Sequence, residues 1–146
     1  NILMKKALLL VTLCFATAVF AQGKHEKIKA LKVAHITEQL NLTPKEAENF
    51  WPIYNASEEK MHALRKTERH EVMKKIKNEF NSLTDAEAAA LITKSIELKE
   101  KELEVYRSLV SDLTGVIPPK KIMLLRKAED DFKRHLLERY RKKKEK

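Results

Sequence analysis

Five histidines are the side chains of this sequence best suited to bind a transition metal, because imidazole is a common ligand of zinc, copper and nickel. They are scattered along the chain, at His25, His35, His62, His70 and His135. No two of them stand four residues apart, the spacing that places both rings on one helix face. Asp131 and His135 have this spacing, but such a pair on an exposed helix usually forms a surface contact. We therefore expect no metal site and no cofactor.

Serines and paired carboxylates are the remaining side chains that could support catalysis. The chain has two glycines, too few for an oxyanion turn or a phosphate-binding loop. The serines fall on expected helices or at a helix start, at Ser57, Ser82, Ser95, Ser108 and Ser111. Adjacent carboxylates, such as Asp130 and Asp131, do not face each other on a helix. We expect neither enzymatic activity nor a small-molecule substrate.

The composition and the apolar spacing both predict helices. Charged residues make up 35% of the 146 residues and aromatic residues 6%, with only two glycines and four prolines. This composition disfavours β-sandwiches and glycine-rich nucleotide-binding domains and is typical of long helices. Apolar residues recur every three or four positions over about 26–40, 43–80, 84–113 and from 119 onward.

These segments predict an all-α fold, an elongated bundle of about four helices arranged as helical hairpins. Pro52 is expected to bend the second segment. The expected apolar stripe of the third segment consists of Ile92, Ile96, Leu103, Tyr106, Val110 and Leu113. The core of so small a chain is limited, so we also expect an intertwined or packed homodimer.

Aromatic residues concentrate in one short segment. Phe50, Trp51 and Tyr54 could form an aromatic ligand patch or part of the core where the first two helices join. We favour the core, because large aromatic side chains contribute most by burial.

Two segments share the pattern Leu-Thr-x-x-Glu-Ala, beginning at Leu42 and at Leu83. In each, the hydroxyl of Thr43 or Thr84 can accept a hydrogen bond from the backbone N–H three residues on. The carboxylate of Glu46 or Glu87 can in turn accept one from the threonine N–H. This reciprocal arrangement is a capping box, so both segments are predicted helix starts.

Paired Leu-Thr-x-x-Gln motifs at helix starts, in a small helical protein with an export signal, characterise the Spy/CpxP family. This sequence resembles that family over roughly residues 36–140, and its segment 42–54 is similar to the branch described as sensors of extracytoplasmic-function sigma factors. Glu46 and Glu87 stand where the family has glutamine, and either side chain can close a capping box. The resemblance implies a periplasmic, ATP-independent chaperone. The alternative is an envelope-stress regulator, including sigma-factor-linked or metal-linked sensors, that docks on a partner protein.

The N-terminal residues have the pattern of a Sec signal peptide. A short basic region at Met4-Lys5-Lys6 precedes an apolar run over 7–20, too short to span a bilayer comfortably. Ala21 then precedes the expected cut before Gln22. Lipoprotein processing at Cys14 is disfavoured because Leu13 is too large. We expect residues 1–21 to be removed, a single helical domain over 22–140 and a periplasmic protein without disulfides, since Cys14 is the only cysteine.

Positive charge concentrates near the C-terminus. The net charge is +9, and residues 133–146 carry eight basic and two acidic residues. The basic tail over 141–146 either complements the helix dipole or attracts an anionic lipid surface or an acidic partner. Nucleic acid is not an expected partner, because the protein is expected to be exported and its basic stretches lack interleaved aromatic residues.

A second basic stretch, over 60–77, mixes cations with apolar residues. The expected partners are unfolded or misfolded envelope proteins, with a membrane sensor protein as the alternative. Such clients would contact methionines and other adaptable side chains amid mobile charge. The candidate client-binding residues are Met61, Leu64, Arg65, Lys66, Arg69 and Met73. The same apolar residues could instead be the buried side of the second helix.

Overall fold

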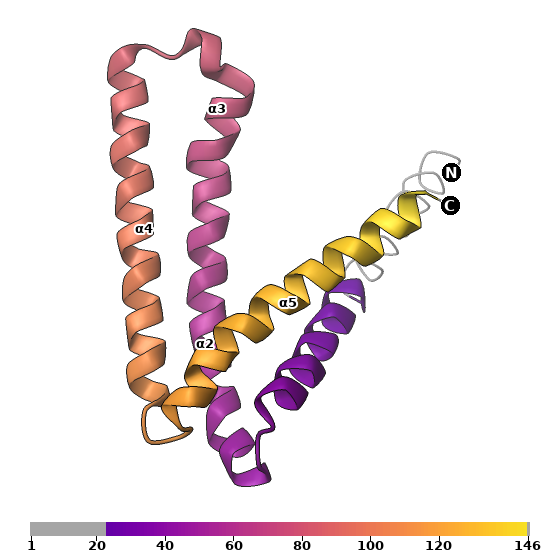
Figure 1. Ribbon diagram of the computed structural model, residues 1–146. Coiled ribbons are helices and arrows are strands. Elements are labelled where there is room, and N and C mark those ends of the chain that lie inside the picture. The colour runs from indigo at the N-terminus through magenta and orange to yellow at the C-terminus, as the bar shows by residue number, and fades with distance from the viewer. Residues whose placement is uncertain (1–22, 146) are drawn as a thin grey trace, which may run out of the picture. The chain divides into compact units, whose positions relative to one another are not determined.

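The computed structural model describes residues 23–145, and helices make up nearly all of this part (Figure 1). No strand occurs among these residues, and one isolated β-bridge joins Thr114 and Ile117. The predicted all-α fold is therefore confirmed. The predicted export signal over 1–21 lies outside the described residues.

The described chain packs as two compact units. One unit is Leu42–Met123, and its main feature is a hairpin of two long helices. Its first limb is α2 (Pro44–Thr67), a π-helical segment (Glu68–Met73), α3 (Lys74–Glu79) and a short 3-10 turn (Phe80–Ser82). Its second limb is α4 (Asp85–Leu113), which packs along α2.

The first limb differs from the single bent helix predicted over 43–80. α2 continues through Pro52, and the helix type changes only at Glu68. In the π-helical segment the N–H of Lys74 donates to the carbonyl of Arg69, five residues back. A π turn holds more residues than an α turn, so it rotates the side chains that follow relative to those before it. Val72 is buried there, whereas the next residue, Met73, is 51% exposed.

The inward stripe of α4 also differs from the prediction. The buried residues of this helix are Leu98, Leu109 and Leu113. Their spacings of eleven and four residues place them on one face. Four residues of the expected apolar stripe are instead largely exposed, namely Ile92, Ile96, Leu103 and Tyr106. The predicted stripe was wrong for these four because α4 carries two neighbouring apolar stripes, and the other one packs against α2.

Among the described residues, the second unit contains residues 23–41 and 124–145. A helix over 23–40 packs beside α5 (Pro119–Lys144), which begins in the first unit. The His35 ring links these helices, with Nε2 3.1 Å from the carbonyl oxygen of Ala128 and the ring centroid 5.7 Å from that of Phe132. The predicted basic tail is helical as far as Lys144.

The chain changes direction at the predicted positions. Asn41 ends the first helix with φ 46°, a left-handed conformation that asparagine tolerates better than most residues. Gly115 adopts φ 89° after α4, and Pro119 begins α5. A proline is favoured at a helix start because it has no N–H to leave unpaired there.

Two leucine substitutions in α4 test which stripe is buried. Leu98→Ala removes a side chain that is 2% exposed and should lower the free energy of unfolding by about 2–5 kcal/mol. Leu103→Ala makes the same change where the side chain is 49% exposed and should alter it by no more than about 0.5 kcal/mol. Urea denaturation measures both. Equal losses would mean that the stripe of Leu103 is also covered.

Candidate functional site

Both predicted capping boxes form. The Thr43 hydroxyl accepts from the N–H of Glu46 at 3.2 Å, and the Thr43 N–H donates to Glu46 Oε2 at 2.9 Å. The second box has the same two distances, between Thr84 and Glu87. The leucine before each box, Leu42 or Leu83, is half-buried. The two motifs therefore begin α2 and α4, as predicted.

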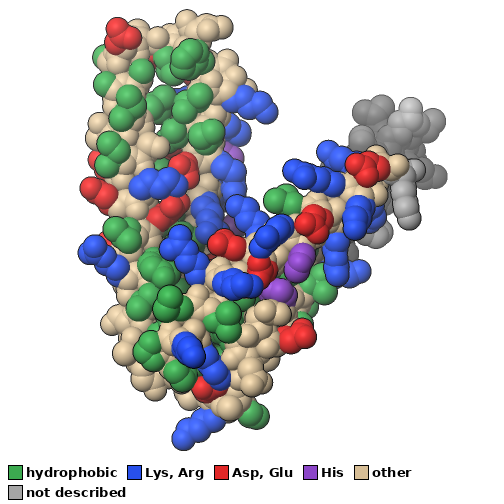
Figure 2. Space-filling model, viewed as in Figure 1, with side chains coloured by type: hydrophobic (Ala, Val, Ile, Leu, Met, Phe, Trp, Pro, Cys, Tyr) green, Lys and Arg blue, Asp and Glu red, His purple; other side chains and the backbone are tan. Residues whose placement is uncertain are grey.

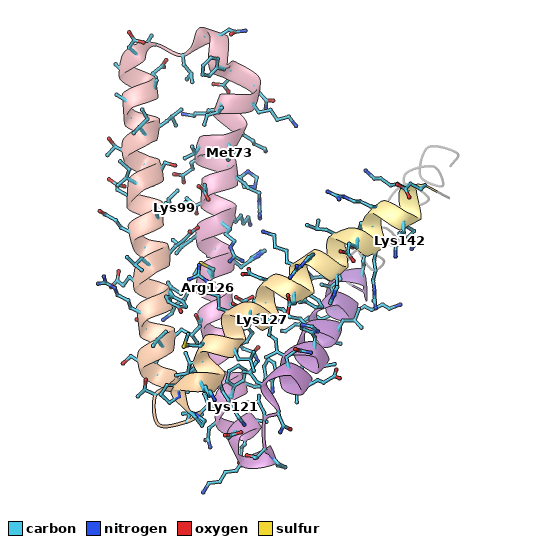
Figure 3. All side chains as sticks on the ribbon, in the orientation of Figure 1. Met73, Lys99, Lys121, Arg126, Lys127 and Lys142 are labelled. Carbon is cyan, nitrogen blue, oxygen red and sulfur yellow. The ribbon has the colours of Figure 1, made fainter. Side chains whose placement is uncertain are left out.

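The two glutamates have different surroundings. Lys121, at the start of α5, donates to Glu46 Oε2 at 2.6 Å, and Figure 3 shows it near the foot of the hairpin. This bond and the one from the Thr43 N–H hold the pKa of Glu46 below its usual value of 4.5. The pKa of Glu87 is lowered mainly by the N–H of Thr84. Glu46 thus joins two parts of the chain, in addition to capping α2.

Exposed hydrophobic side chains gather on one side of the hairpin, and we call them the apolar face. On α4 these exposed side chains lie around the position of Lys99, one residue after the buried Leu98. On the first limb they begin at Met73, one residue after the buried Val72. In two packed antiparallel helices, the positions that follow the buried residues by one residue in sequence lie on the same side of the pair. Figure 2 shows hydrophobic side chains gathered over α3 and α4. The members of the apolar face are Met73, Ile76, Phe80, Ile92, Ile96, Leu103 and Tyr106.

Ion pairs link the π-helical segment to α4 beside this face. Lys99 Nζ lies 3.2 Å from Glu68 Oε2 and 3.1 Å from Glu102 Oε2. These two bonds raise the pKa of Lys99, with Glu102 contributing most. Lys94 forms a further ion pair with Glu71 at 3.1 Å. Lys99 lies within the apolar face, as Figure 3 shows, so charge interrupts the exposed hydrophobic surface.

The candidate client-binding residues do not form one surface. Met73 belongs to the apolar face, and Met61 is half-buried. Leu64 is also half-buried and lines a shallow groove with Lys60, Lys101 and Val105. This groove lies on the side of the hairpin opposite the apolar face. Around each helix axis, its residues are rotated away from the buried positions in the other direction. Three cations of the candidate set are exposed on the first limb, at Arg65, Lys66 and Arg69.

The apolar face was not predicted from the sequence, which indicated Ile92, Ile96, Leu103 and Tyr106 only as the apolar stripe of α4. The available signal was the doubled apolar pattern of α4. A second apolar stripe has a spacing similar to that of the predicted stripe and consists of Leu91, Leu98, Val105 and Leu109. Which of the two stripes is buried depends on the helix that packs against α4.

Phe50, Trp51 and Tyr54 pack together, as expected of core residues. The Phe50 and Tyr54 rings are stacked with centroids 5.4 Å apart, and both side chains are buried. The Trp51 ring stands edge-on to both, at 4.9 and 5.5 Å. The cluster anchors the first turns of α2.

No three metal-ligating side chains come together among residues 23–145. His35 and His135 lie side by side, with ring centroids 6.1 Å apart. Asp131, the acidic neighbour of His135 in sequence, instead pairs with Lys127 at 2.7 Å and with Arg134. These cations, Lys127 foremost, lower the pKa of Asp131 and occupy its two oxygens.

Searches of family models, curated proteins and solved structures returned no match to this chain. The resemblance to the Spy/CpxP family therefore depends on features of the sequence only: the paired motifs, the segment 42–54, the expected export signal and the helical character. Within the described part of the chain, no helix combines the length and the apolar character needed to cross a membrane.

The ion pair of Glu46 predicts a difference between two otherwise matched substitutions. Glu46→Gln and Glu87→Gln both leave a side chain able to close the capping box, but only the first removes the carboxylate that Lys121 Nζ contacts at 2.6 Å. At pH 7 Glu46→Gln should therefore lower the melting temperature more than Glu87→Gln does. Equal losses would show that Lys121 adds nothing to the folded state.

The pH dependence checks the same contact. Because the pKa of Glu46 is lowered in the folded chain, its ionised carboxylate stabilises that chain above about pH 4.5. This contribution is lost as the pH falls through the lowered pKa. The difference in melting temperature between wild type and Glu46→Gln should thus shrink from pH 6 to pH 3.

Proposed function

We propose that this protein is an exported, ATP-independent, chaperone-like protein of Spy/CpxP type that binds unfolded or misfolded envelope proteins. The observation that carries the proposal is the apolar face, seven large hydrophobic side chains left exposed on one side of the hairpin. Soluble monomers seldom expose a contiguous apolar patch larger than a few hundred Å² unless it binds something. The paired capping motifs and the expected export signal add support.

The chemistry of the apolar face suits weak binding of unfolded chains. Phe80 and Ile92, at 68% and 63% exposure, offer apolar contacts to the exposed hydrophobic residues of a client. Met73 adds a flexible, polarisable side chain that adapts to different partners. Lys99 divides the face, so a client gains several small contacts without one deep pocket. Release then needs no ATP, which is absent outside the cytoplasm.

Substitutions on α4 test this use of the apolar face. The double variant Ile96→Gln and Leu103→Gln keeps good helix formers at exposed positions. It should weaken client binding roughly tenfold or more, since full burial of one such side chain contributes about 1.5–3 kcal/mol. Suppression of aggregation of an unrelated unfolding protein at equimolar ratio measures the effect.

The matched control is Met123→Gln with Leu137→Gln, which removes two exposed hydrophobic residues outside the apolar face. It should suppress aggregation as well as wild type does. A wild-type protein that fails to suppress aggregation would contradict the proposal and favour a regulator that docks on one sensor. Light scattering shows whether a second copy of the chain covers the apolar face. In that case the double variant Ile96→Gln and Leu103→Gln would convert a dimer into a monomer.

The exposed cations of the first limb predict a salt-dependent association. Replacing Arg65, Lys66 and Arg69 by Gln should slow association with an acidic unfolded client several-fold at 0.1 M salt. At 1 M salt the Debye length falls from about 10 Å to about 3 Å, so variant and wild type should associate at similar rates. Stopped-flow fluorescence measures both rates. Association that accelerates with salt would mean that recognition is hydrophobic only.

A further inference from the structure

The unit that contains the helix over 23–40 has a second exposed surface, which the proposed client binding does not involve. The helix over 23–40 and the C-terminal half of α5 enclose an open groove of about 760 Å³. Its floor is apolar and consists of Ile28, Leu31, Leu136 and Tyr140. Leu31 and Tyr140 remain 38% and 37% exposed, so the floor is open to a ligand.

Cations surround this floor on both helices. Five basic side chains line the groove and no carboxylate does; they are Lys24, Lys27, Arg139, Lys143 and Lys144. Lys24 Nζ lies 4.9 Å from the centroid of the Tyr140 ring, which joins the two helices at the rim. Within the part of the chain that the structure describes, none of the five forms an ion pair with a carboxylate.

The helix dipole does not account for this arrangement. Cations in the last turn of α5 offset the partial negative charge at that end, and this explains Lys143 and Lys144. Lys24 and Lys27 lie on the other helix, outside the last turn of α5, so completing that turn does not by itself explain the basic side chains at the groove. Figure 2 shows that basic side chains continue along α5 toward its C-terminal end, where Figure 3 labels Lys142.

An apolar floor bordered by cations that have no carboxylate partner is complementary to an anionic amphiphile. The acyl region of a lipid supplies apolar contacts, and its phosphate supplies negative charge. An acidic segment without apolar side chains would satisfy the cations but would leave Leu31 and Tyr140 without apolar partners. We propose that this groove docks the protein on the surface of an anionic lipid bilayer.

Vesicle co-sedimentation tests the proposal with the chain purified after export. The wild type should bind phosphatidylglycerol–phosphatidylcholine vesicles at 0.1 M salt at least tenfold more tightly than pure phosphatidylcholine vesicles. Lys24→Gln, Lys27→Gln and Lys143→Gln together should lower binding to the anionic vesicles about tenfold or more, since each basic residue near an anionic surface contributes to the attraction.

The matched charge control is the Gln triple at Arg65, Lys66 and Arg69, which removes the same charge from the other unit. It should bind anionic vesicles within twofold of wild type. An equal loss in both triples would overturn the proposal and leave only a net-charge effect. Equal binding of wild type to both vesicle types would overturn it as well.

A second pair of variants tests the apolar floor. Leu31→Gln should lower the binding that persists at 0.5 M salt several-fold, whereas Leu137→Gln, which does not line the groove and is 52% exposed, should not. Equal effects would contradict insertion at the groove. Full displacement from vesicles by soluble polyglutamate would show that the groove recognises acidic polymers, and would overturn the lipid assignment.

Discussion

A helix that packs against a single neighbour can bury only one stripe of its surface, and α4 carries two apolar stripes. Within the hairpin, Leu98 and Leu109 lie on the buried stripe, and Ile96 and Leu103 stay outside. The exposed stripe is therefore a consequence of the two-helix architecture. In this register Lys94 and Lys99 form ion pairs with Glu71 and Glu68 of the π-helical segment.

Electrostatics distinguishes two motifs that look alike in sequence. Both capping boxes satisfy the same backbone groups at nearly identical distances. Only Glu46 lies within reach of Lys121, which comes from the chain beyond α4. The first motif thus combines a local function, starting α2, with a long-range one, closing the foot of the hairpin. A glutamine could perform the first function but not offer the charge for the second.

Local rules predicted the ends of the helices and little of their packing. Thr43, Thr84 and Pro119 start helices where the sequence indicates, and Asn41 and Gly115 end them, because capping and backbone conformation depend on neighbours in sequence. The choice between the two stripes of α4 depends on α2, about forty residues away, so spacing alone could not decide it. The contact between Glu46 and Lys121 spans 75 positions and leaves no periodic signal.

The π-helical segment has a further consequence for how such a hairpin can change over time. One additional residue in a helix rotates everything after it by about 100° while leaving the axis in place. Here Val72 of the segment is buried, whereas Met73, Ile76 and Phe80 are exposed. A single insertion or deletion within Glu68–Met73 would therefore change, in one mutational step, which of the following side chains are exposed. The tip of the hairpin can acquire a new chemical character without redesign of α2 or α4.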